Sequence, residues 1–249
     1  MDFGLQGKVA IVTGGAAGIG AAIAEQLARE GCDVAIVDRA GGERAAAVAA
    51  RVEAAGRRAS VHEADVADFA LAERTVAAIA AAHGRVDVLV CCAGVTDDGL
   101  SWKLTEAQWD RVLGVNLKGC FNWCRAVAPL LRDQRAGRIV NIASINGLRG
   151  TFGQANYAAS KGGMVALSKT LARELGKFGV TVNVVAPGMV RTEMAASLPY
   201  EVLEKAVDET LTGRLAEPAD CAAVVAFLCS DAARHVTGQV VKVDGGQYL

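Results

Sequence analysis

The sequence predicts an α/β protein in which one doubly wound parallel sheet carries helices on both faces. Short runs rich in Val and Ile alternate with longer stretches rich in Ala, Glu and Arg along the 249 residues. The short runs are continuously apolar, as strands covered on both faces require. No repeat or low-complexity linker divides the chain, so we expect one domain over residues 1–249.

Strands are expected where β-branched residues cluster, because such side chains pack well on a pleated surface. The first cluster is Val9-Ala10-Ile11-Val12, and similar short runs recur to the end of the chain. The expected strands are residues 9–12, 33–37, 59–62, 86–91, 138–142, 180–185 and 240–243.

Helices are expected in the stretches between these runs, where residues of high helix propensity dominate. Each of these stretches is long enough to return the chain to the start of the next parallel strand. The expected helices are residues 19–29, 43–54, 71–82, 106–132, 155–177, 199–209 and 218–228.

Composition and charge exclude several classes of function. Twenty-six basic residues nearly balance 27 acidic ones, and no block of Lys and Arg occurs, so nucleic acid is not an expected partner. Apolar residues make up 52% of the chain, yet no apolar run reaches the ~18 residues of a membrane span. The first residues lack the features of a signal peptide. We therefore expect a cytoplasmic protein that does not bind membranes.

The seven cysteines are expected to be free thiols. Most lie in apolar segments, and a protein of this size in a reducing compartment does not need disulfides. Cys120 and Cys124 are spaced to share a helix face, but zinc would need two more ligands. The three histidines stand far apart in the sequence, so we expect no metal site.

A glycine-rich segment lies between the first strand and the first helix. Gly14, Gly18 and Gly20 allow a tight turn in which the backbone can approach a pyrophosphate, and the following helix start offers free N–H groups. A glycine-rich turn is often only a turn. Its position after the first strand of an α/β pattern favours a dinucleotide site.

Asp38 and Arg39 end the second expected strand, where the adenosine ribose of a dinucleotide would lie. A carboxylate at this place accepts hydrogen bonds from the ribose hydroxyls and repels a 2′-phosphate. Arg39 could hold that phosphate or stack on adenine. We therefore expect NAD as the cofactor, with NADP as the alternative.

Tyr157 and Lys161 are one helical turn apart and face the same way. A free tyrosine has a pKa near ~10 and is a poor base at neutral pH. A nearby ammonium group favours the phenolate, so this pair predicts a phenol that exchanges a proton with a substrate oxygen. A pair of unrelated surface residues would give the same spacing.

Two further polar residues fit such a site. Ser144 follows the strand ending at Ile142, at the carboxyl edge of the sheet, and could hydrogen-bond the reacting oxygen. Asn116 lies between apolar neighbours inside the expected helix 106–132. A turn cap for Ser144 and a structural hydrogen bond for Asn116 are the alternatives.

These residues together resemble the short-chain dehydrogenase/reductase family. Residues 13–20 match the family's Thr-Gly-x-x-x-Gly-x-Gly turn, and its Asn, Ser, Tyr and Lys set is matched by Asn116, Ser144, Tyr157 and Lys161. The resemblance extends from about residue 5 to residue 246 and includes the Pro-Gly segment 187–192. It implies a Rossmann-type sheet of seven parallel strands in the order 3-2-1-4-5-6-7, with a dinucleotide-binding first half and a catalytic second half.

The resemblance also implies roles for these residues. Tyr157 would be the general acid/base, Lys161 would hold the nicotinamide ribose and lower the tyrosine pKa, Ser144 would orient the substrate, and Asn116 would support a proton relay through water. The residues implied to contact the cofactor, apart from Tyr157 and Lys161, are Gly14, Ala17, Gly18, Ile19, Gly20, Asp38, Arg39, Asp65, Val66, Cys92, Ala93, Gly94, Pro187, Gly188, Val190 and Thr192.

One departure from the family pattern lies after the fourth strand. The family usually has Asn-Asn-Ala-Gly there, and this chain has Cys91-Cys92-Ala93-Gly94. Backbone contacts to the cofactor would survive, whereas the asparagine side-chain hydrogen bonds would not, because a thiol is a weak donor. We expect Cys92 to be an inert buried thiol, with a reactive thiol as the alternative.

Within the family the chain looks most like the 3-oxoacyl-[acyl-carrier-protein] reductase group, through residues 153–157 and the ending 243–249. The substrate is then a 3-oxoacyl thioester, with acyl carrier protein as a partner and a homotetramer as the family's usual assembly. The expected substrate contacts are Ser144, Asn146, Gln154, Tyr157 and Met194.

Other functions stay open on the sequence alone. NAD-dependent dehydrogenases of sugars, polyols or other secondary alcohols have nearly the same pattern. A catalytically silent NAD(H)-binding regulatory protein, or an isomerase or dehydratase that uses the cofactor transiently, would also have this fold, because a fold alone does not establish chemistry.

Overall fold

The computed structural model describes residues 3–196 and 198–249, except for the side chain of Met194. Seven parallel strands form one sheet in the order β3-β2-β1-β4-β5-β6-β7, which confirms the expected Rossmann-type arrangement. Each strand lies within two residues of its predicted bounds. The strands are β1 (Val9–Thr13), β2 (Asp33–Asp38), β3 (Ala59–Glu63), β4 (Val88–Cys91), β5 (Gly137–Ile142), β6 (Val180–Pro187) and β7 (Val240–Val243).

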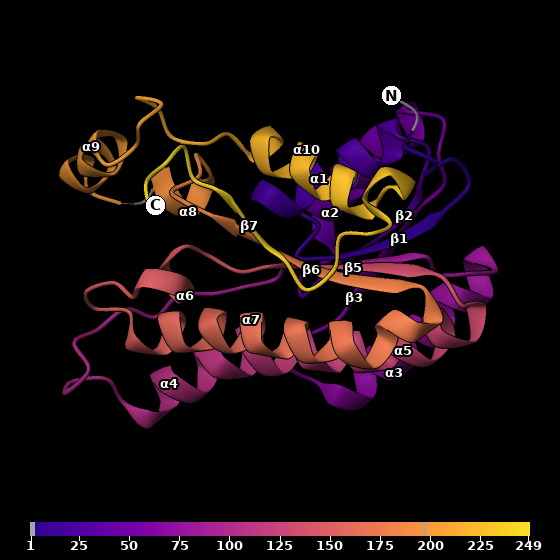
Figure 1. Ribbon diagram of the computed structural model, residues 1–249, viewed down its shortest axis with the longest axis horizontal. Helices are drawn as coiled ribbons and strands as arrows, with labels where there is room; N and C mark the ends of the chain where they lie inside the picture. The colour runs from indigo at the N-terminus through magenta and orange to yellow at the C-terminus, as the bar shows by residue number, and fades with distance from the viewer. Residues whose placement is uncertain (1–2, 197) are drawn as a thin grey trace.

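Helices cover both faces of the sheet (Figure 1). One face carries α1 (Gly18–Arg29), α2 (Gly42–Ala54) and α10 (Pro218–Cys229). The other face carries α3 (Phe69–His83), α4 (Glu106–Leu113), α5 (Gly119–Gln134) and α7 (Ala155–Leu175). Three short helices, α6 (Asn146–Arg149), α8 (Glu193–Ala196) and α9 (Tyr200–Asp208), follow strands β5 and β6.

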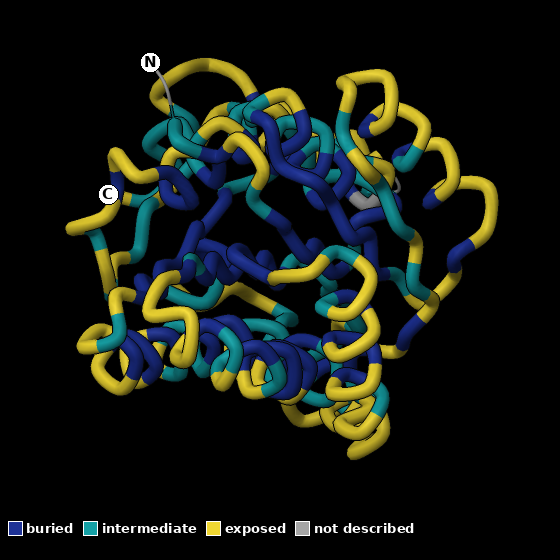
Figure 2. The backbone as a smooth tube through the Cα atoms, turned by 90° about the vertical axis from the view of Figure 1, so that its right-hand side faces the viewer, coloured by how far each residue is buried: buried dark blue, intermediate teal, exposed yellow. Residues whose placement is uncertain are grey.

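The sheet separates two apolar cores, so both faces of its central strands are buried (Figure 2). Alternate side chains of one strand enter different cores: Ile11 packs on the α3/α5/α7 side, whereas Val12 packs on the α1/α10 side. This division explains why the strands are apolar without alternation. It also leaves the strand ends as the place where polar side chains can gather.

The expected helix 106–132 is interrupted, which corrects the sequence prediction. A π-helical turn, η1 (Gly114–Lys118), separates α4 from α5. Asn116 lies in this turn with its side chain fully buried. Its Oδ1 accepts a hydrogen bond from the Val95 N–H at 2.8 Å, and its Nδ2 donates to the Val95 carbonyl at 3.0 Å. The wider turn thus serves to aim an amide at the loop after β4.

The carboxyl ends of β1, β2, β4, β5 and β6 lie along one edge of the sheet, because the strands are parallel. In doubly wound folds this edge holds the ligand, at the point where the strand order reverses. Here the order reverses between β1 and β4. Within residues 3–196 and 198–249, no helix is long and apolar enough to cross a membrane.

Candidate active site

The turn after β1 requires glycine at three places. Gly14 has φ +65°, and a Cβ there would lie 2.7 Å from the Ala93 Cα. Gly18 has φ +54°, and a Cβ on Gly20 would lie 2.1 Å from the Gly14 carbonyl oxygen. Side chains are therefore excluded at these three positions, which leaves room for a ligand at the start of α1. This arrangement suits a pyrophosphate held by backbone N–H groups.

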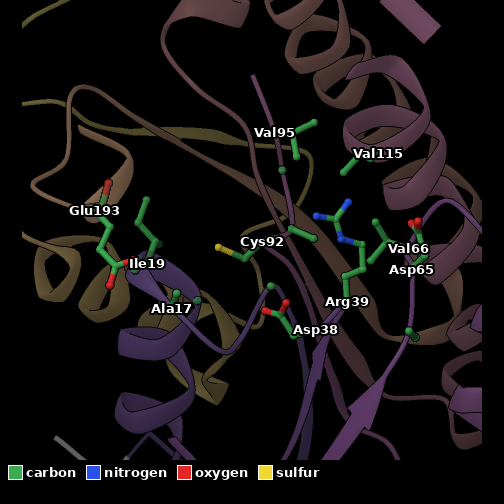
Figure 3. Close-up of a pocket in the computed structure, with 17 residues that line it drawn as sticks. Ala17, Ile19, Asp38, Arg39, Asp65, Val66, Cys92, Val95, Val115 and Glu193 are labelled. Atoms are coloured by element: carbon green, nitrogen blue, oxygen red, sulfur yellow. The ribbon is translucent and has the colours of Figure 1, made fainter. Parts of the chain in front are cut away.

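A cavity of about 400 Å³ opens above this turn. Figure 3 shows Ala17 and Ile19 at the start of α1 on one side of the cavity and Asp65 and Val66 after β3 on the other. The structure brings together most of the residues expected to contact the cofactor. Those that line this cavity are Gly14, Ala17, Gly18, Ile19, Gly20, Asp38, Arg39, Asp65, Val66, Cys92, Ala93, Gly94 and Thr192.

Asp38 is held at the end of β2 by the glycine-rich turn. Its Oδ2 accepts a hydrogen bond from the Ala16 N–H at 3.2 Å. This contact fixes the carboxylate at the cavity wall, where it can also accept from ribose hydroxyls. Arg39 is exposed, and its side chain also lines the cavity (Figure 3). The cavity therefore fits an adenine dinucleotide.

A second cavity of about 300 Å³ adjoins the first, and the two share Ile19, Cys92, Gly94, Val95 and Thr192 in their walls. The remaining predicted site residues, apart from Asn116 and Met194, line this second cavity: Ser144, Asn146, Gln154, Tyr157, Lys161, Pro187, Gly188 and Val190. A substrate in the second cavity would thus border a dinucleotide in the first. The Met194 side chain lies outside the described residues.

The environment of Tyr157 differs from the expected one. Burial raises the pKa of Tyr157 to about 12, and a side-chain hydrogen bond with Ser144 only partly offsets this effect. The tyrosine pKa is therefore raised, whereas the resemblance led us to expect a lowered one, and the effect of Lys161 on it stays a prediction. The physical reason is that removing the phenolate from water costs more than the neighbouring groups return. A raised pKa favours the neutral phenol, which is the form that can donate a proton.

Lys161 is almost completely buried beneath Tyr157. Its Nζ donates a hydrogen bond to the Ile142 carbonyl at 2.8 Å and lies 5.6 Å from the centre of the Tyr157 ring. Burial lowers the pKa of Lys161. The bond to Ile142 fixes the head group at the cavity floor, where its remaining N–H donors can face a ribose.

Asn116 lines neither of the two cavities. Besides its two bonds to Val95, its Nδ2 donates to Ser160 Oγ at 3.1 Å, and Ser160 Oγ donates to the Tyr157 carbonyl at 2.7 Å. The amide therefore joins the loop after β4 to the turn of α7 that carries Tyr157. This is the structural hydrogen bonding that the sequence left as an alternative, and the proton relay stays a prediction.

Cys92 lies where the two cavities meet. Burial raises the pKa of its thiol to about 12, so the thiol is protonated and a weak nucleophile at neutral pH. Its backbone N–H donates to Thr13 Oγ1 at 3.1 Å, as does the Ala93 N–H at 3.3 Å. Thr13 thus holds the ends of β1 and β4 together without a contribution from the Cys92 side chain.

Among the residues of the second cavity that the sequence analysis did not name as site residues are Asp98, Arg149 and Gln247. Asp98 accepts a hydrogen bond from Gln154 Nε2 at 2.9 Å, and Gln154 Oε1 accepts from Asn146 Nδ2 at 3.1 Å. Arg149 and Gln247 line the same cavity. Arg149 binds the Glu209 carboxylate at 3.2 Å, which connects α6 to the residue after α9. These residues meet only through the tertiary fold, and no local motif marks them.

Comparison with known proteins agrees with this geometry. A family model described as enoyl-(acyl carrier protein) reductase matches residues 14–247. The chain is 41% identical over 242 residues to a 3-oxoacyl-[acyl-carrier-protein] reductase, FabG, of Staphylococcus epidermidis, covering 97% of this chain and 99% of that protein. It is 40% identical to the protein of the same name from Thermotoga maritima, covering 97% of this chain and 98% of that one.

Solved structures show the same similarity. A crystal structure of levodione reductase superposes with a TM-score of 0.93 at 35% identity, covering 97% of this chain and 98% of that one. Fold, site and relatives together define a nicotinamide-dependent oxidoreductase. The chain belongs to the short-chain dehydrogenase/reductase family.

The glycine-rich turn generates a prediction about cofactor binding. Replacing Gly20 with Ala places a methyl group against the Gly14 carbonyl, so the turn must move. We expect NADH binding, measured by fluorescence titration, to weaken roughly 100-fold, or about 2.7 kcal/mol. Gly176→Ala is the control, since a Cβ there meets nothing within 4 Å. Unchanged NADH affinity in a folded Gly20→Ala protein would contradict the placement of the pyrophosphate.

Proposed function

We propose that this protein reduces the 3-oxo group of an acyl thioester to a secondary alcohol with NADH. One observation carries the proposal: the half-buried phenol of Tyr157, whose raised pKa of about 12 favours its protonated form, lines the same cavity as Ser144, and this cavity adjoins the dinucleotide cavity. The 3-oxoacyl-[acyl-carrier-protein] reductases at 41% and 40% identity support the choice of substrate.

The residues of the second cavity divide the reaction between them. Ser144 and Tyr157 form a donor pair for the carbonyl oxygen of the substrate, and Tyr157 gives its proton to the oxygen as the alcohol forms. Lys161 orients the cofactor ribose and keeps a positive charge below the phenol. The reduced nicotinamide supplies the hydride. Val190 and Ala195 are buried wall residues that limit access of water to the carbonyl.

The lining of the second cavity fits an acyl thioester. One set of wall residues is apolar: Ile142, Ala143, Ile145, Met189, Val190, Ala195 and Leu198. The other is polar and includes the linked amides of Asn146 and Gln154. An acyl chain can pack on the first set, and the amides of a pantetheine arm can hydrogen-bond to the second.

A carrier protein must approach the mouth of this cavity. Arg135 and Lys177, beside Phe178, are exposed cations to which an acidic carrier protein could bind. Lys177, however, follows the C-terminal end of α7, whereas Tyr157 lies near its N-terminal end. Lys177 is 20 residues from Tyr157, or about 30 Å along a helix. Docking on these two residues would leave the thioester far from Tyr157 of the same chain. We therefore infer that the carrier meets the loops around Asp98 and α6.

The proposal includes a cytoplasmic homotetramer with one domain over residues 1–249. Trp109 of α4 and Phe121 of α5 are 39% and 42% exposed, and such aromatic side chains are suited to an interface. Light scattering of the purified protein would give its mass. A monomer of 25.7 kDa would exclude the tetramer.

Tyr157 provides the direct test of catalysis. We expect Tyr157→Phe to lower kcat for a 3-oxoacyl thioester by about 10²- to 10⁴-fold with little effect on NADH binding, because only the proton donor is removed. Tyr200→Phe, at a residue 71% exposed, is the control. The assay follows the oxidation of NADH with 3-oxoacyl thioesters and cyclic ketones as substrates. With polyols it follows the reverse reaction, the reduction of NAD.

Each outcome of this assay decides between functions. Preference for thioesters supports the proposal, and preference for cyclic ketones or polyols would replace the substrate class. NADH binding without turnover of any compound would indicate a regulatory protein. Product formation without net change in NADH would indicate an isomerase or dehydratase.

The raised pKa of Tyr157 predicts different pH profiles for the two directions. Since its pKa is about 12, the phenol stays protonated through neutral pH and is already in the form that reduction needs. We expect kcat/KM for the ketone to be flat between about pH 6 and 9, whereas kcat/KM for the alcohol rises with pH because oxidation needs the phenolate. If kcat/KM for the ketone instead rises with pH between about pH 6 and 9, the assignment of Tyr157 as the proton donor would be contradicted.

Asp38 predicts the choice of cofactor. We expect the parent protein to bind NADH more tightly than NADPH, because a 2′-phosphate would meet the carboxylate fixed by Ala16. Asp38→Ser should weaken NADH binding and strengthen NADPH binding, each roughly tenfold. Glu43→Gln, an exposed carboxylate of α2, is the matched control. Tighter NADPH binding by the parent protein would assign the leading role to Arg39.

A further inference from the structure

Three buried cysteines converge beneath the active site, on elements far apart in sequence. Cys91 ends β4, and Cys120 and Cys124 lie one turn apart on α5. Their Sγ atoms all lie within 4.8 Å of one another, and the Cys120 and Cys124 sulfurs are 4.0 Å apart. The three side chains are at most 5% exposed. From the sequence, only Cys120 and Cys124 could be expected to lie close together, because β4 contacts α5 only in the folded chain.

Asn141 supplies a fourth donor atom to this cluster. It pairs with Cys91 across β4 and β5, and its Oδ1 lies 3.7 Å from the Cys124 sulfur. Its Nδ2 donates to Ser168 Oγ at 2.9 Å, and Ser168 Oγ donates to the Met164 carbonyl at 2.7 Å. These bonds fix the oxygen of the amide on the side of the thiols. Such supporting hydrogen bonds commonly orient metal ligands.

The separation of the Cys120 and Cys124 sulfurs fits tetrahedral coordination, and the Cys91 sulfur lies within 4.8 Å of both. A zinc ion bound at about 2.3 Å from each sulfur holds the sulfurs about 3.8 Å apart. The observed separation of 4.0 Å is close to this value. In the metal-free protein the Cys124 thiol donates a weak hydrogen bond to the Asn141 oxygen, so the oxygen and the sulfur already face each other.

We propose that Cys91, Cys120, Cys124 and the Asn141 oxygen form a binding site for a thiophilic divalent cation of the zinc type. Binding replaces the thiol protons with the ion, so up to three protons leave for each ion bound. Three thiolates and one divalent cation carry a net charge of −1. The buried ammonium of Lys161 acts electrostatically on Cys91 and Cys120 and offsets this charge.

The ion would join β4 and β5 to α5 directly below the catalytic residues. Cys91 precedes Cys92, which lines both cavities, and Asn141 precedes Ile142, whose carbonyl holds Lys161. The site is therefore a structural brace for the floor of the active site. It has no direct contact with the substrate cavity, since none of its four ligands lines that cavity.

Cobalt(II) is the probe, because cobalt bound by sulfur has a near-ultraviolet charge-transfer band and tetrahedral cobalt has strong visible bands. The full-length protein is tested under reducing, anaerobic conditions in two ways. Folded protein is titrated with cobalt, and protein is also produced in cobalt-supplemented medium so that the ion is present during folding. We expect about one sulfur-bound ion per chain, and a higher Tm in the loaded protein.

Cys124→Ala and Asn141→Ala test the ligand assignment. Cys229→Ala is the matched control, because Cys229 is equally buried but lies in the core on the other face of the sheet. We expect Cys124→Ala to lose the charge-transfer band and the rise in Tm, Asn141→Ala to change the visible bands, and Cys229→Ala to behave as the parent. Circular dichroism checks that each variant is folded.

The proposal is overturned if the folded parent protein shows no sulfur–cobalt band in either preparation, or if the band persists in Cys124→Ala. His62 and His83 lie near each other, because both contact Ser60, and they could bind cobalt as a second site. Cobalt bound there would show no sulfur–cobalt band, and this result would count as absence of the proposed cysteine site. This test does not depend on turnover, so its result is independent of the proposed reaction.

Discussion

The close approach of two backbone segments at the crevice between β1 and β4 determines the geometry of the whole site. Gly14 has no room for a side chain against Ala93, and Thr13 binds the N–H groups of both Cys92 and Ala93. The strand order reverses at this point, so α1 and α5 leave toward opposite faces of the sheet. The opening between them is where a diphosphate can meet the free N–H groups of α1.

The same crevice is connected to α7, the helix that carries Tyr157, by a chain of hydrogen bonds. The loop after β4 is bound at Val95 by Asn116, Asn116 binds Ser160, and Ser160 binds the carbonyl of Tyr157. The π-helical turn is the local distortion that lets Asn116 reach both partners. A shift of the loop would therefore move Tyr157 relative to the dinucleotide cavity. The hydrogen bonds of Asn116 thus connect the two segments, although Asn116 itself lines neither cavity.

The sequence predicted features that depend on neighbouring residues, but it did not predict features that depend on residues far apart in the chain. The sheet, its helices and the glycine-rich turn follow from local patterns, and Gly14, Gly18 and Gly20 indeed line one cavity. The hydrogen bonds that Asn116 makes from the π turn could not be read locally, because their partner Val95 is distant in the sequence. The Tyr157 pKa was predicted in the wrong direction, since spacing to Lys161 reveals a neighbouring charge but not the extent of burial.

The half-buried phenol of Tyr157 and the buried ammonium of Lys161 show how removal from water shifts the protonation of a group. Desolvation disfavours the charged form of each group, so it raises the pKa of Tyr157 and lowers that of Lys161. A tyrosine held neutral is a proton donor, and this is the form that carbonyl reduction needs. The reverse reaction would first have to form a phenolate in the same cavity, with the Lys161 ammonium 5.6 Å from the centre of the ring. The packing of the protein's own residues therefore favours the protonated form of Tyr157, which is the form that the proposed reduction uses.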